Sequence, residues 1–129
     1  METVLIFANT FFKTNICANM TKFRTIFLED VIEFFDELDE KARNKIIFNI
    51  DKAEQTNDPR LFKKLTNEIW EFRTQYNSLQ YRLLAFWDKR DNQDTLVVCS
   101  HGIIKKTDKV PSKEIEKSEK IRKNYFDNQ

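Results

Sequence analysis

Apolar residues recur at helical spacing between Phe27 and Ala53. They step by three and four positions, which places them along one side of a helix. The positions in this series are Phe27, Val31, Phe34, Phe35, Leu38, Ala42, Ile46, Ile47, Ile50 and Ala53. The segment Leu38-Asp39-Glu40 is the expected break, because the Asp39 side chain can cap a second helix. The pattern predicts two antiparallel helices, followed by a polar stretch that contains Pro59.

Beyond this segment the apolar period shortens from about 3.6 residues to about 2. Three runs rich in aromatic and branched residues predict strands joined by hairpins. These runs are residues 69–75, 80–88 and 95–104, with a shorter strand expected around 63–65. Pro111 and Ser112 then begin a final helix with a thin apolar stripe. The order predicts an α+β fold, in which an N-terminal helical hairpin packs on a small antiparallel sheet and a C-terminal helix follows.

Composition is that of one globular domain. The chain has 129 residues, of which 40% are hydrophobic and 33% are charged. Cys17 and Cys99 are too few and too distant in sequence for a disulfide framework or a zinc site. We therefore expect a reducing, cytoplasmic location.

Residues 1–19 differ from the rest of the chain. They are apolar, but Glu2 precedes any basic residue, which disfavours a signal peptide, and polar residues interrupt the run. The run is also too short and polar to span a membrane. We expect an N-terminal extension, with translation beginning at Met20, or alternatively a strand or tail. A single domain would then cover residues 20–129.

The net charge of +1 hides an asymmetry between the two halves of the chain. Residues 1–59 contain 11 acidic and 7 basic residues, whereas residues 60–129 contain 10 acidic and 15 basic residues. A basic second half can form a positive face that attracts phosphates, although the charges can equally cover solvated surfaces.

Several cations converge in the predicted sheet. Alternation along residues 80–88 places Arg82 on a partly apolar face, where it needs either an acidic partner such as Glu71 or a bound phosphate. Arg73 is in phase with Glu71 on the preceding strand. The third strand ends with His101, Lys105 and Lys106. Like charges repel unless an anion lies between them, so the pattern favours phosphate binding. Four further residues are also positively charged and are candidate RNA-binding residues: Arg60, Lys63, Lys64 and Lys109.

Nucleotide and metal cofactors are not expected. The chain has one glycine and lacks P-loop, dinucleotide-binding and HExxH patterns. RNA cleavage requires none of these, because the adjacent 2′-hydroxyl is the nucleophile. The protein need only supply a base, an acid and stabilisation of the charge on phosphorus.

Four segments carry a resemblance to a known family: "FLEDVIEFFDELDEKARNKI", "KKLTNEIWEFR", "QYRLLAFW" and "HGIIKKTDKVPSKEIEKSEKI". In order and spacing, residues 20–126 resemble the phage-derived RelE/HigB-like toxins of type II toxin-antitoxin systems. The resemblance implies a RelE-like fold and a metal-independent, cytoplasmic endoribonuclease that cuts mRNA, typically on the ribosome. It also implies a cognate helix-turn-helix antitoxin. The alternative is a non-catalytic RelE-fold protein that binds RNA or a partner.

The resemblance also suggests roles for individual residues. Arg73 and Arg82 would stabilise charge at the scissile phosphate, and Lys105 or Lys106 would act as base or acid or would support the leaving group. His101 is either an acid-base group or a packed, hydrogen-bonded residue. Gly102 is expected to allow a bulge or bend in the strand.

Overall fold

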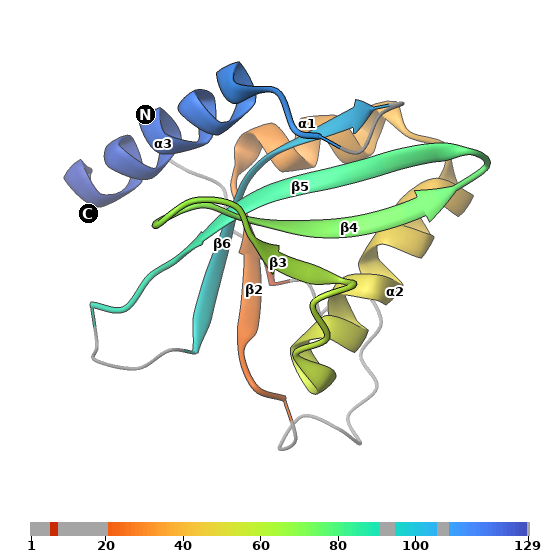
Figure 1. The fold of residues 1–129 in the computed structure, drawn as a ribbon, viewed down its shortest axis with the longest axis horizontal. Coiled ribbons are helices and arrows are strands. Elements are labelled where there is room, and N and C mark those ends of the chain that lie inside the picture. Colours follow the sequence, from red (N-terminus) through yellow and green to blue (C-terminus); the bar gives the residue numbers. More distant parts are fainter. Residues whose placement is uncertain (1–5, 8–20, 91–94, 106–108, 129) are drawn as a thin grey trace.

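The structure, a computed structural model, describes residues 6–7, 21–90, 95–105 and 109–128. These residues form six strands and three helices. In chain order they are β1 (Ile6–Phe7), β2 (Arg24–Phe27), α1 (Glu29–Glu37), α2 (Glu40–Thr56), β3 (Phe62–Lys64), β4 (Trp70–Tyr76), β5 (Leu79–Trp87), β6 (Leu96–Lys105) and α3 (Ser112–Asp127), as Figure 1 shows. The predicted strands and the C-terminal helix are therefore present, together with two strands that precede α1.

The strands form one mixed sheet in the order β1-β2-β6-β5-β4-β3. β2 runs parallel to β6, and the other neighbouring pairs are antiparallel. The prediction of an N-terminal helical hairpin on a small antiparallel sheet is therefore wrong. It failed because Phe27 is in phase with the apolar stripe of α1 although it ends β2. A strand of four residues is too short to show a period of its own.

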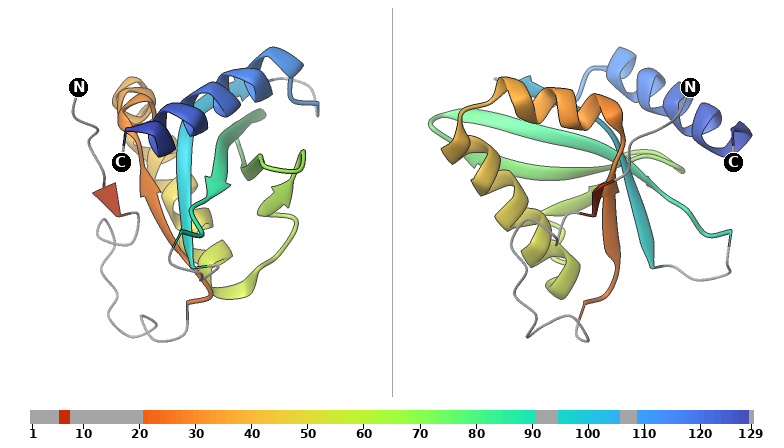
Figure 2. Two further views of the ribbon diagram at one scale, coloured as in Figure 1. Left: turned by 90° about the vertical axis from the view of Figure 1, so that its left-hand side faces the viewer. Right: turned by 180° about the vertical axis from the view of Figure 1, so that it is seen from behind.

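Helices cover both faces of the sheet (Figure 2). α1 and α2 pack on one face, where residues such as Val31 and Ile50 join Phe72 and Leu83 of the sheet in a core cluster. α3 packs on the other face, where Tyr125 belongs to a second cluster with strand residues that include Leu84 and Phe86. The alternation of apolar residues along β5 thus feeds two separate cores.

Local signals in the sequence account for the boundaries of several elements. The Asp39 carboxylate accepts a hydrogen bond of 2.7 Å from the Ala42 backbone N–H, which confirms Asp39 as the N-cap of α2. Asn57, the C-cap of α2, has a left-handed φ of 58°. Asn77 and Ser78 have φ of 54° and 64° and form the two-residue turn between β4 and β5.

The register of β5 on β6 contains one irregularity. Leu84 pairs with His101 and Ala85 pairs with Cys99, so Ser100 is the extra residue of a bulge. The expected bulge therefore lies at Ser100 rather than at Gly102. Gly102 has a different function in the fold, because a Cβ added there would lie 2.4 Å from the ring of Phe34 in α1. Its missing side chain lets α1 approach β6.

Little of the predicted N-terminal extension can be compared with the structure. Ile6–Phe7 pairs antiparallel with β2, and the other positions of residues 1–19, like Met20, lie outside the described residues. Among the helices that the structure describes, none combines the length and apolar character needed to cross a bilayer.

Glu54 of α2 is a buried carboxyl group that makes stability depend on pH. The side chain is 0% exposed, and burial raises its pKa from 4.5 to about 7, against the opposing effect of the Thr25 hydroxyl. A carboxyl group whose pKa is higher in the folded state binds its proton more tightly there. The contribution of protonated Glu54 to the free energy of unfolding is fully present below pH 4.5 and is lost as the pH rises through about 7.

We therefore expect Glu54→Gln to have a higher free energy of unfolding than the wild type, by more at pH 8 than at pH 5. This advantage over the wild type should grow by about 2–3 kcal/mol from pH 5 to pH 8, because folding raises the pKa of Glu54 from 4.5 to about 7 and one pH unit in that range corresponds to about 1.4 kcal/mol. Urea unfolding at both pH values measures it. Glu119→Gln, at an exposed position of α3, is the matched control and should show no such pH dependence. Equal responses of the two variants would contradict this account of Glu54.

Candidate functional site

Cationic side chains from four neighbouring strands share the sheet face opposite α1 and α2. Lys63 pairs with Glu71, Arg73 with Arg82, and Gln80 with Lys105 in the strand registers. Directly opposite residues lie about 5 Å apart and point to the same face. We call Lys63, Glu71, Arg73, Arg82 and Lys105 the cationic face. The structure thus brings together four of the basic residues predicted to bind or cleave RNA.

Glu71 forms ion pairs with both arginines of this face. Its Oε1 lies 3.2 Å from Arg82 Nε, and its Oε2 lies 3.6 Å from Arg73 Nε. The side chains of Glu71 and Arg82 are 5% and 3% exposed, whereas that of Arg73 is 30% exposed. The structural pairing of Arg82 with Glu71 is therefore confirmed. Arg73 is the arginine that solvent, and hence an incoming anion, can reach.

Further hydrogen bonds hold Arg82 in place. Its Nη1 donates to the Tyr81 carbonyl over 3.0 Å, and its Nη2 donates to the side-chain oxygen of Gln80. Two guanidinium groups directly opposite each other repel, and among the described residues Glu71 is the carboxylate that forms ion pairs with them. Four of the five residues of the cationic face are basic and one is acidic, and such a group attracts an anion such as phosphate.

His101 is buried between the sheet and α3. It is 2% exposed, and burial lowers its pKa below 6.5. Its Nε2 lies 3.0 Å from Glu114 Oε1, and its Nδ1 lies 3.1 Å from Ser100 Oγ. Ser100 Oγ also lies 2.8 Å from Ser118 Oγ of α3. Both ring nitrogens thus have partners, as the packed alternative predicts. The sequence pattern missed Glu114 and Ser118, because the bulge that turns His101 toward α3 has no signature of its own.

The other predicted site residues have varied surroundings. Lys105 is 7% exposed, and Lys109 is exposed just before α3. Lys106 lies outside the described residues. Arg60 forms an exposed ion pair with Asp58 at 2.9 Å. Lys64 has the opposite phase to Lys63 on β3 and lies beside Trp70, away from the cationic face.

Tyr125, the last tyrosine of the chain, is a residue of α3 and belongs to the core cluster between α3 and the sheet. It is 7% exposed, and its hydroxyl donates a hydrogen bond of 2.7 Å to Asp88 Oδ2. Burial raises the pKa of Tyr125 to about 12, and the hydrogen bonds from Arg90 lower that of Asp88 to about 2. In the part of the chain that the structure describes, no group of three or more His, Cys, Asp or Glu residues could hold a metal ion.

A family model described as "Phage derived protein Gp49-like (DUF891)" matches residues 33–123. The chain belongs to this Gp49-like family. The matched residues include the whole cationic face and His101, so the family pattern extends over the candidate site. No curated protein and no solved structure matches the Gp49-like chain. The match confirms that the resemblance to phage-derived proteins was correct at the level of this family.

Proposed function

We propose that this Gp49-like protein is the toxin of a type II toxin-antitoxin system and cleaves mRNA on the ribosome. The observation that carries the proposal is the pair of opposed arginines, Arg73 and Arg82, on one face of the sheet. Only one carboxylate, Glu71, forms ion pairs with them among the described residues. Membership of a phage-derived family, which is generally toxin-like, supports the same proposal.

The proposed reaction requires no cofactor. The 2′-oxygen of the RNA attacks the adjacent phosphorus and loses its proton to a base, and the bond from phosphorus to the 5′-oxygen breaks as that oxygen gains a proton. The products are a 2′,3′-cyclic phosphate and a 5′-hydroxyl. In this scheme Arg73 contacts the phosphate and stabilises its charge in the transition state. Arg82 is a positioning residue that acts through Glu71.

Lys105 and Lys106 are the proposed base and acid, in an order that the scheme leaves open. We assign His101 to holding α3 on the sheet, because it is buried and its two ring nitrogens already have partners. Lys63, which lies opposite Glu71, extends the positive surface for the RNA backbone.

The proposed protein partner is a helix-turn-helix antitoxin. Exposed acidic residues gather on α1 and the connection to α2, on the helical layer opposite the cationic face. They are Glu29, Asp30, Glu33, Asp36, Glu37, Asp39 and Glu40. A basic segment of an antitoxin could bind there by charge complementarity. The proposed location is the cytoplasm, where mRNA and ribosomes are found.

A second candidate function is RNA binding without cleavage. The burial of Arg82 and Lys105 favours it, because both side chains are held within the fold.

The decisive experiment adds the purified protein to a reconstituted translation reaction and maps RNA ends by primer extension. We expect cuts that require ribosomes and leave 5′-hydroxyl ends, which a kinase labels without prior phosphatase treatment. Salt-sensitive RNA binding without any cut would overturn the toxin proposal in favour of the second candidate.

A further inference from the structure

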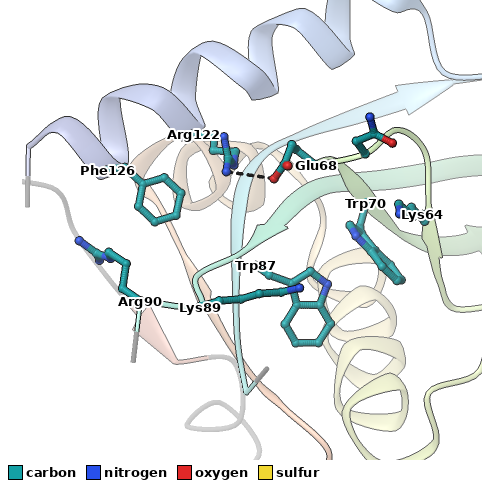
Figure 3. Close-up of a pocket in the computed structure, with 9 residues that line it drawn as sticks. Lys64, Glu68, Trp70, Trp87, Lys89, Arg90, Arg122 and Phe126 are labelled. Carbon is teal, nitrogen blue, oxygen red and sulfur yellow. Dashed lines mark ion pairs between the residues drawn. The ribbon is translucent and has the colours of Figure 1, made fainter. Parts of the chain in front are cut away.

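A pocket of about 460 Å³ lies where β5 ends and β4 begins, beside the C-terminal half of α3 (Figure 3). Among the described residues, the pocket lining includes one carboxylate, that of Glu68, and four basic residues, Lys64, Lys89, Arg90 and Arg122. Lys64 and Trp70 directly follow or precede Lys63 and Glu71 in sequence, but successive side chains of a strand point to opposite faces of the sheet. Lys64, Trp70 and Trp87 therefore point away from the cationic face.

The two tryptophans of the chain, Trp70 and Trp87, both line this pocket. Their ring centroids are 6.0 Å apart, with an angle of 83° between the ring planes. The core holds Trp70 from behind, because its ring stacks on Phe62 at 4.9 Å. Both tryptophans remain partly exposed. They offer rigid aromatic surfaces on which a further flat ring can stack.

The basic residues of the pocket divide into two groups. Arg122 pairs with Glu68 at 3.0 Å, and Arg90 pairs with Asp88 at 2.7 Å, so these two arginines are held by the protein itself. Lys64 and Lys89 are exposed, and Lys89 Nζ lies 5.9 Å from the centre of the Trp87 ring. Exposed lysines beside partly exposed aromatic rings suit a ligand that carries both planar rings and phosphates.

The surface continues beyond this pocket. A second hollow of about 290 Å³ shares Trp70, Trp87 and Lys89 with the first and adds Lys22 and Asn57. The two hollows therefore meet at Trp70 and Trp87. Lys64 lines the first hollow and Lys22 lines the second. This arrangement fits an extended chain of nucleotides better than a single small molecule.

We propose that this tryptophan pocket (Lys64, Trp70, Trp87 and Lys89) binds single-stranded RNA. An unpaired base stacks on the tryptophans and the two lysines contact the neighbouring phosphates. The proposal rests on RNA as the substrate of the proposed function and adds a subsite for nucleotides away from the cleaved phosphate. An acidic peptide would satisfy the lysines but would leave the stacking surface without a matching ring.

The experiment uses the intrinsic fluorescence of the full chain, since both tryptophans report from this pocket. The probe is a short 2′-O-methyl oligoadenylate, which cannot be cleaved because its 2′-oxygens are blocked. We expect saturable quenching of the fluorescence. The double variant Lys64→Ala/Lys89→Ala should weaken binding at least about fivefold. It should also reduce the salt slope by about 1.4, as expected for two lost contacts to single-stranded phosphates.

The control is Lys41→Ala/Lys45→Ala, which removes two exposed lysines of α2 and should leave binding unchanged. Absence of quenching in the wild type, equal losses in both double variants, or equal quenching by polyglutamate would each overturn the proposal. Failure of the proposed function is distinguishable from these results. A wild-type protein that cuts no RNA but shows the quenching refutes the toxin, whereas one that cuts RNA without quenching refutes the pocket.

Discussion

Replacing Glu71 with leucine is expected to lower the free energy of unfolding by about 3–5 kcal/mol. The change leaves the guanidinium of Arg82, with a side chain 3% exposed, without its carboxylate partner at 3.2 Å. Removing the ion-pair partner of a buried charge is among the most costly changes in a folded protein. The double variant Glu71→Leu/Arg82→Met should recover much of this loss, because an apolar pair can replace a buried ion pair. Urea unfolding measures both values.

Two controls separate this effect from a general intolerance of substitution. Glu119→Leu changes an exposed glutamate and should alter stability by no more than about 0.5 kcal/mol. Arg73→Met removes the partly exposed partner of Glu71 and should cost about 1 kcal/mol or less. If the double variant is no more stable than Glu71→Leu alone, the pairing of Glu71 with Arg82 is not what stabilises this part of the sheet.

The sequence was most informative where a periodic pattern or a specific capping residue determines the local structure. The apolar spacing of α1 and α2, the Asp39 cap and the strands from Trp70 to Lys105 could be predicted in this way. β2 could not, because its position depends on parallel pairing with β6, a contact between residues about seventy positions apart. No local pattern encodes such a pairing. For this reason the sheet was wrongly predicted to be entirely antiparallel.

The candidate site could also be predicted only in part from the sequence. Alternation along β4 correctly placed Arg73 in phase with Glu71, and Glu71 was one of the two alternatives considered as a partner for Arg82. Alternation could not indicate that burial would make Arg82 an internal group and Arg73 the accessible one, since burial depends on the whole fold. The tryptophan pocket was also missed. It combines the ends of three strands with α3, and Trp70 and Trp87 appear in the sequence as ordinary apolar strand residues.

Arg73→Ala is expected to reduce mRNA cleavage by about 100- to 1,000-fold, the usual loss when one donor to a developing negative charge is removed. Its free energy of unfolding should change by no more than about 1 kcal/mol, because its ion pair with Glu71 is partly exposed. Arg82→Ala should lose both activity and stability, because it leaves Glu71 buried without its closest cation. Single-turnover cleavage on translating ribosomes and urea unfolding, measured on the same preparations, distinguish the two variants.

The matched control is Lys41→Ala, which removes a positive charge from the surface of α2 and should cleave like the wild type. Arg73→Lys keeps the charge but loses the planar pair of donors, so we expect partial activity. Cleavage by Arg73→Ala within twofold of the wild type would remove Arg73 from the reaction. The accessible phosphate contact would then have to be sought elsewhere on the cationic face, with Lys63 as the next residue to test.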